Sequence, residues 1–92
     1  MEVEWDPDKA SANLKKHGVS FDDALLVFYD AGRIEMTDGR ESYGEDRWVT
    51  IGVVYPAVLF VVYTIRDGET IRIISARKAN GQEQRQYRQA NS

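Results

Sequence analysis

The chain has 92 residues, 42% of them hydrophobic, which suffices for one domain with a modest core, and we predict a single domain over residues 1–92. Zero cysteines exclude disulfides and thiolate metal sites, and one histidine makes a zinc site unexpected, so we expect no metal and no other cofactor. The net charge of −3 combines two unlike halves: residues 1–46 carry 5 basic and 12 acidic side chains, a balance of −7, and residues 47–92 carry 7 and 3, a balance of +4. Because a surface field follows the local charge, the basic half favours a contact with RNA.

The first residues, Met1 to Asp6, are acidic and do not have the basic start and apolar run of a signal peptide. The longest mainly apolar stretch, residues 51–65, is interrupted by Gly52 and Pro56 and is too short to span a bilayer. We therefore expect a cytoplasmic protein with no membrane contact.

The first third of the chain predicts a strand followed by two helices. Apolar and acidic residues alternate over residues 1–5, which is typical of a half-buried strand. Asp6 and Pro7 are suited to begin a helix that runs to about Lys16 and ends at Gly18. Ser20 is placed to begin a second helix, which stops at residues 30–32.

The remaining residues predict a sheet and a final helix. A short strand is expected at residues 33–36 and a polar loop at 37–46, followed by strands at 47–54, 57–65 and 70–78. Asn80 and Glu83 have the spacing of a capping box and predict a polar C-terminal helix. The expected fold class is α+β, with two N-terminal helices packed on an antiparallel sheet and a C-terminal helix.

Several short motifs, in this order along the chain, resemble the BrnT family of bacterial type II toxin–antitoxin toxins; they are Trp5-Asp6-Pro7, residues 16–21, Val27-Phe28, Ile51-Gly52, residues 72–79, Glu83 and Tyr87. The resemblance implies a RelE-like fold and a metal-independent ribonuclease that arrests translation. It also implies neutralisation by a BrnA-type antitoxin with a ribbon-helix-helix region, so that operator DNA is contacted only through the antitoxin.

Cleavage of RNA without a metal requires cations that neutralise the reacting phosphate and a group that transfers protons. Arginine suits the first task, because its planar guanidinium binds phosphate through two hydrogen bonds. Histidine, glutamate, lysine and tyrosine can all perform the second. The candidate catalytic residues are therefore Arg47, Arg66, Arg72, Arg77, His17 and Glu45, and the candidate RNA-binding residues are Lys78, Trp48, Tyr63, Arg85 and Tyr87.

Strand pairing decides which of these cations share a face. A two-residue turn at Asp67-Gly68 would pair Arg66 with Glu69, Tyr63 with Arg72 and Val58 with Arg77, and a turn at Tyr55-Pro56 would pair Arg47 with Thr64. Side chains alternate between faces, so Arg47, Arg66 and Arg77 would share the face of Val49, Ile51 and Phe60, which we expect the helices to cover. Arg72 and Lys78 would lie on the opposite face with Trp48 and Tyr63, which could stack RNA bases.

Each candidate also has a structural interpretation. The arginines could form salt bridges with the acidic half, and His17 could stabilise the end of a helix. Glu45 could be a solvated loop residue, Trp48 a packing residue, and Tyr87 the anchor of the last helix. For the whole chain, the alternative is a non-catalytic antitoxin-binding module or a degenerate toxin that acts in operon autoregulation.

Overall fold

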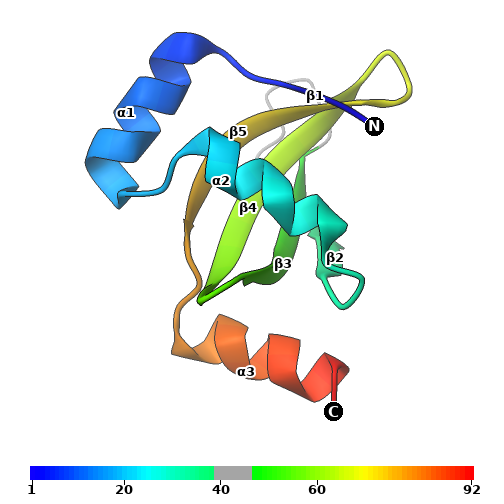
Figure 1. The fold of residues 1–92 in the computed structure, drawn as a ribbon. Coiled ribbons are helices and arrows are strands. Elements are labelled where there is room, and N and C mark those ends of the chain that lie inside the picture. Colours follow the sequence, from blue (N-terminus) through cyan, green and yellow to red (C-terminus); the bar gives the residue numbers. More distant parts are fainter. Residues whose placement is uncertain (39–46) are drawn as a thin grey trace.

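The computed structural model describes residues 1–38 and 47–92, and within these ranges five strands form one sheet in the order β1-β5-β4-β3-β2 (Figure 1). Along the chain the elements are β1 (Glu2–Glu4), α1 (Pro7–His17), α2 (Phe21–Ala24), the 3-10 helix η1 (Leu25–Tyr29), β2 (Ile34–Thr37), β3 (Trp48–Val54), β4 (Ala57–Arg66), β5 (Thr70–Lys78) and α3 (Gly81–Ala90). The predicted α+β class and element order are confirmed. The sheet is mixed, because β1 pairs parallel to β5 while the other pairs are antiparallel.

The helices begin and end at the residues whose chemistry predicts it. The Asp6 carboxylate accepts the N–H of Asp8 at 2.9 Å, and Gly18 ends α1 with a left-handed φ of 71°. The Ser20 hydroxyl accepts the N–H of Asp23 at 3.0 Å and caps α2. The second predicted helix is two segments, since α2 tightens into η1 after one turn.

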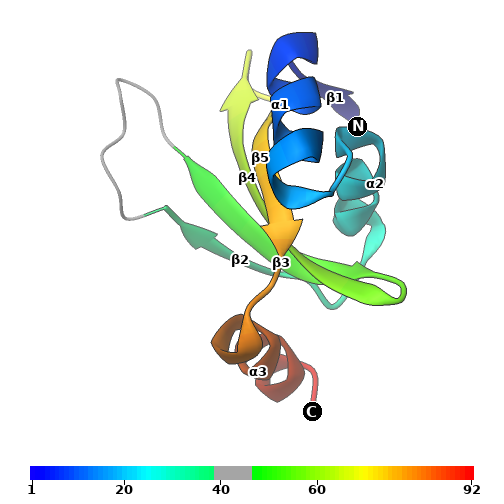
Figure 2. The same ribbon diagram turned by 90° about the vertical axis from the view of Figure 1, so that its left-hand side faces the viewer.

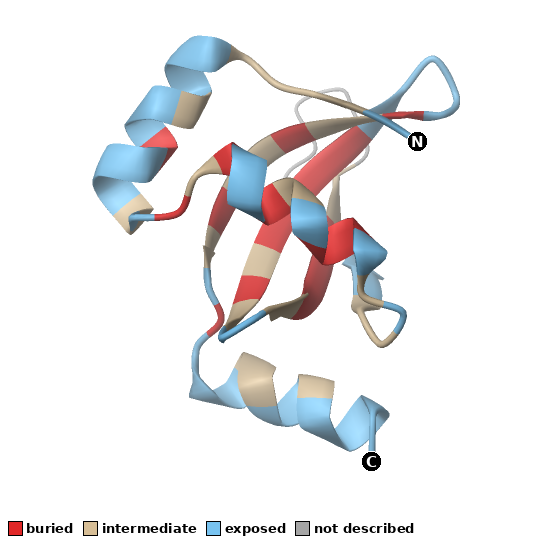
Figure 3. Ribbon diagram, in the orientation of Figure 1, coloured by how far each residue is buried: buried red, intermediate tan, exposed pale blue. Residues whose placement is uncertain are grey.

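The main core lies between the sheet and the helices α1, α2 and η1, which cover one face of it (Figures 1 and 2). Buried positions occur both on the helices and on the sheet (Figure 3). Among the fully buried residues, Phe21 and Val27 belong to α2 and η1, and Val61 and Ile73 belong to β4 and β5. Phe28 meets Tyr63 edge to face, with ring centroids 5.1 Å apart. Within residues 1–38 and 47–92, no helix is long and apolar enough to cross a membrane.

The opposite side of the sheet, which we call the open face, bears Phe60, Val62, Thr64, Arg66, Arg72, Ser75 and Arg77. α3 lies at one end of the molecule, below the sheet in Figure 2, where its Tyr87 packs with a second cluster that includes Ile51, Val58 and Phe60. α3 therefore borders the open face without extending along it.

Strand pairing confirms one predicted register and corrects the other. β3 and β4 pair as predicted, with Trp48 opposite Tyr63. Between β4 and β5, however, Arg66 pairs with Thr70 rather than Glu69, so the turn is one residue longer than predicted. A bulge at Val62/Tyr63 adds a second shift, which places Phe60 opposite Arg77.

These shifts move Arg72 to the other side of the sheet. Arg72 pairs with Thr64 rather than Tyr63, so it lies on the open face with Arg66 and Arg77. Arg77 lies beyond both the longer turn and the bulge, and two reversals leave its side chain on the predicted face, that of Phe60. The predicted common face of Arg66 and Arg77 is therefore confirmed, and the predicted placement of Arg72 on the other face is wrong.

The expectation about which face the helices cover is also wrong. They pack on the side of Leu59, Val61 and Tyr63, not on the side of Val49 and Ile51. Both sides of β3 and β4 are apolar enough to be buried, so alternation alone could not identify the helix-covered face.

Candidate functional site

A pocket of about 500 Å³ opens on the open face, where the end of α1 approaches β5. Its lining joins three parts of the chain: Lys16 and His17 from α1, Asp38 after β2, and Phe60, Val62, Ser75 and Arg77 from β4 and β5. We call this the Arg77 pocket. It brings together two of the predicted catalytic residues, His17 and Arg77.

The end of α1 reaches this pocket because Asn13 fastens the helix to the edge of β5. β1 pairs only with Thr70 to Arg72, and beyond it the buried Asn13 amide takes the place of a strand partner. Its Nδ2 donates to the carbonyls of Ala76 (2.8 Å) and Val19 (2.9 Å), and its Oδ1 accepts the N–H of Ala76 at 3.1 Å. His17 follows Asn13 by one helical turn, so it faces the same strand edge next to Arg77.

The guanidinium of Arg77 is held in one orientation. Nη1 and Nη2 donate to the two carboxylate oxygens of Glu83 at 2.8 and 2.9 Å, and Nη1 also donates to the carbonyl of Lys78 at 3.2 Å. Its carbon Cζ lies 3.9 Å from the ring centroid of Phe60, within cation–π range. The bonds from Arg77 are the main reason that the pKa of Glu83 lies below its ordinary value.

Arg66 and Arg72 form a separate basic group on the same face. Arg72 donates to the carboxylate of its β1 neighbour Glu4 at 2.7 Å, and Arg66 lies 3.7 Å from the same oxygen. Arg72 and Arg77 are five residues apart on β5, roughly 16 Å at the rise of a strand. These cations therefore cannot contact the same phosphate.

Two further predicted catalytic residues lie at or near the 39–46 segment. Arg47 directly precedes β3, is half-buried, and accepts the N–H of Asp38 with its carbonyl at 2.9 Å. Alternation along the strand assigns its side chain to the face of Val49. Glu45 lies outside the described residues.

The predicted aromatic platform is not on the open face. Tyr63 is only 4% exposed in the core beneath Phe28, and burial, reinforced by Glu35, raises the pKa of its hydroxyl to about 12. Trp48 is half-buried against the same core. The expectation of an accessible aromatic ring is wrong for Tyr63, because the helices cover its face, while the half-burial of Trp48 agrees with its interpretation as a packing residue.

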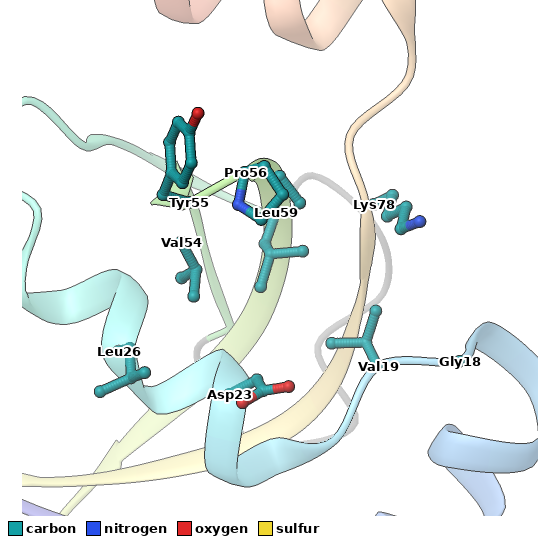
Figure 4. A pocket seen from close by; sticks show the side chains of 10 residues that line it. Gly18, Val19, Asp23, Leu26, Val54, Tyr55, Pro56, Leu59 and Lys78 are labelled. Atoms are coloured by element: carbon teal, nitrogen blue, oxygen red, sulfur yellow. The ribbon is translucent and has the colours of Figure 1, made fainter.

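Lys78 and the α3 residues are dispersed. Lys78 pairs with Leu59 and lies at the rim of a second pocket on the α2 side, where its ammonium group points away from the apolar lining (Figure 4). Arg85 is exposed on α3. The Tyr87 hydroxyl donates to Asp30 at 2.6 Å, which raises the pKa of Tyr87 to about 12 and matches its interpretation as an anchor.

Sequence reasoning missed Asn13, Lys16, Ser75 and the role of Glu83 as the partner of Arg77. The capping-box spacing located Glu83 on the helix, but nothing local indicates that its carboxylate also reaches β5. Within residues 1–38 and 47–92, no cluster of three or more histidine, aspartate or glutamate side chains could hold a metal ion.

Comparisons with known proteins identify the family and the fold. Residues 5–83 match the family described as the ribonuclease toxin BrnT of type II toxin–antitoxin systems. The crystal structure of the Brucella abortus ribonuclease toxin BrnT superposes with a TM-score of 0.67 at 26% sequence identity, covering 87% of this chain and 97% of that one. No curated protein sequence matches the chain.

Proposed function

The chain belongs to the BrnT family of ribonuclease toxins of type II toxin–antitoxin systems, and from this premise we propose that it cleaves RNA at the Arg77 pocket without a metal ion, arresting translation. The observation that carries the proposal is that His17 and Arg77, far apart in sequence, line one open pocket. A proton-transfer group beside a fixed cation is the minimum that such a reaction needs.

Arg77 retains the donors that a phosphate requires. A guanidinium has five N–H groups, and Glu83 and the carbonyl of Lys78 take three of them. In the part of the chain that the structure describes, the Nε–H and the second Nη2–H make no hydrogen bond. These two donors lie along one edge of the guanidinium and form a second fork, which is suited to two oxygens of a phosphate.

In the proposed reaction, the ribose 2′-oxygen attacks the adjacent phosphorus and the bond to the next nucleotide's 5′-oxygen breaks. The products are a 2′,3′-cyclic phosphate and a 5′-hydroxyl. Arg77 stabilises the charge that grows on the non-bridging oxygens, and His17 accepts the proton of the 2′-hydroxyl and returns it to the departing 5′-oxygen. The half-buried position of His17 leaves it accessible to the RNA.

Arg66 and Arg72 extend the proposed RNA contact along the open face. Because they lie too far from Arg77 to reach the reacting phosphate, they bind neighbouring phosphates of the same strand. Arg72→Ala should therefore raise KM and make RNA binding less dependent on salt, with kcat little changed. A fall in kcat at an unaltered KM would contradict this division of roles.

The partner expected from the family is a protein antitoxin. We propose a BrnA-type antitoxin with a ribbon-helix-helix region, through which alone the complex contacts operator DNA, and a cytoplasmic location where RNA is accessible. The support for this part is family membership. Co-expression with the candidate antitoxin should abolish growth arrest and yield a co-purifying complex; persistent arrest would contradict it.

The catalytic proposal is tested with Arg77→Ala and His17→Ala, beside the matched control Arg88→Ala, which removes an exposed arginine of α3. Growth arrest on expression and cleavage of RNA by purified protein are measured for each folded variant. We expect both activities to be lost in the first two variants and retained in the control. Full activity in Arg77→Ala would refute the site. Circular dichroism checks that each variant is folded, so that a loss of activity is not a loss of structure.

A further inference from the structure

We infer that Glu83 is a positioning residue that orients Arg77 for the reacting phosphate, an inference that rests on the proposed ribonuclease function. Glu83 belongs to α3 and does not line the Arg77 pocket, so it acts through Arg77 rather than on the RNA. The C-terminal helix thereby becomes part of the catalytic apparatus.

The geometry leaves the guanidinium little freedom. The carboxylate of Glu83 binds its end through both oxygens, which fixes the direction of the group, and the ring of Phe60 lies 3.9 Å from Cζ. The Lys78 carbonyl takes the outer hydrogen of Nη1. Among the described residues, the Nη1–Nη2 end of the guanidinium is occupied and the Nε–Nη2 edge keeps unbonded donors for a ligand, so the orientation of Glu83 decides where a phosphate can bind.

Glu83 is itself held by the helix that carries it. Its Oε1 accepts the N–H of Asn80 at 2.9 Å, while Asn80 Oδ1 accepts the N–H of Glu83 at 2.9 Å, forming a capping box. The Glu83 side chain is only 14% exposed. One carboxylate therefore joins the start of α3 to the cation of the pocket.

A simple surface salt bridge would not have these features. Exposed pairs contribute little and hold their partners loosely. Here two parallel hydrogen bonds, a ring contact and a helix cap converge on one pair of side chains, and such preorganisation is what a site that stabilises developing charge requires. Catalysis should therefore depend on the charged fork between Glu83 and Arg77 and not only on the docking of α3.

Glu83→Gln separates the role of Glu83 in orienting Arg77 from its role in capping α3. Glutamine is accepted in a capping box, so its Oε1 can still cap Asn80, but its Nε2 would place a donor against the Nη2 donors of Arg77. We expect kcat to fall about 10- to 100-fold, as for a catalytic group misplaced by about an ångström, with KM little changed. The matched control is Gln84→Ala, which removes the 3.1 Å bond from the neighbouring side chain to the Ala79 carbonyl and leaves the fork intact; its kcat should equal that of wild type.

The decisive measurement is a double-mutant cycle under single-turnover conditions. The second background is Arg77→Lys, which keeps a cation but has no guanidinium fork: if Glu83 acts through the fork of Arg77, Glu83→Gln causes no further loss of rate there. An unchanged kcat in Glu83→Gln, an equal loss in both backgrounds, or the same loss in Gln84→Ala would each overturn the positioning role. Wild-type cleavage by Arg77→Ala alone would instead refute the proposed site and, with it, this inference, so the two failures are distinguishable.

Discussion

Replacing Asn13 with alanine should strongly destabilise the protein, although asparagine in a helix is an unremarkable residue by sequence. The side chain is 7% exposed and makes three hydrogen bonds, all to backbone groups outside α1. Alanine would leave the N–H and carbonyl of Ala76 and the carbonyl of Val19 without these partners. It would also detach the end of α1 from β5.

The magnitude follows from those three bonds. At about 1 kcal/mol of net stabilisation each, their loss lowers the free energy of unfolding by about 3 kcal/mol. The loss is larger if water does not reach the backbone groups that Asn13 leaves unpaired. That is a large part of the roughly 5–15 kcal/mol that stabilises a typical domain. For a domain of this size it corresponds to a fall in Tm of about 15 °C.

Urea denaturation followed by circular dichroism measures the effect, and Asn91→Ala is the matched control. Asn91 also donates to two carbonyls, those of Gly32 and Tyr87, but it is exposed, so water can replace it. We expect a loss of less than about 1 kcal/mol for the control. Equal destabilisation by the two variants would refute the reasoning that Asn13 serves as a substitute strand partner.

Two further predictions concern the packing of η1 and α3 on the sheet. Gly52→Ala should destabilise the protein by about 1–3 kcal/mol in urea titrations, because a Cβ there would lie 2.7 Å from Val27 Cγ2, and a neutral substitution would contradict this close approach. Burial raises the pKa of Asp30, but hydrogen bonds from Tyr87 and from the N–H groups of Val53 and Gly32, with the charge of Arg33, outweigh it and leave the pKa below its ordinary value. The stability that the Asp30 carboxylate contributes is therefore fully present above its unfolded pKa near 4 and is lost as the pH falls through its lower folded pKa. Asp30→Asn should weaken the decrease in the free energy of unfolding between pH 7 and pH 3. An unchanged decrease would contradict this.

Local chemistry was sufficient to predict most elements of the fold. Asp6, Ser20 and Asn80 each cap the helix that their position predicts, and Gly18 ends α1. These signals act within a few residues, so one sequence contains all that they require. The division of the second helix into α2 and η1 is a finer feature that the apolar spacing does not reveal.

The register of β5 shows where local reasoning fails. Asp67 and Gly68 both have positive φ, as a tight turn requires, but the turn includes one more residue than the commonest type. The bulge at Val62/Tyr63 has no local sequence signature. Each shift of one residue reverses the face of every later side chain, which is why Arg72 was assigned to the wrong side.

The candidate site was only partly predictable for the same reason. His17 and Arg77 were identified by residue type, yet their proximity depends on Asn13, which connects residues 63 positions apart. The pairing of Glu83 with Arg77 likewise depends on how α3 docks beneath the sheet. Contacts of this kind arise from the tertiary fold and leave no periodic pattern in the sequence.

The most direct test of the central claim is the chemistry of the RNA ends. Purified protein is incubated with RNA in EDTA, beside Arg77→Ala, and the termini of the fragments are identified. The account predicts that wild type cleaves with the chelator present and leaves 2′,3′-cyclic phosphate and 5′-hydroxyl ends, while the variant does not cleave. Cleavage only after Mg²⁺ is restored, or fragments with 3′-hydroxyl ends, would contradict it.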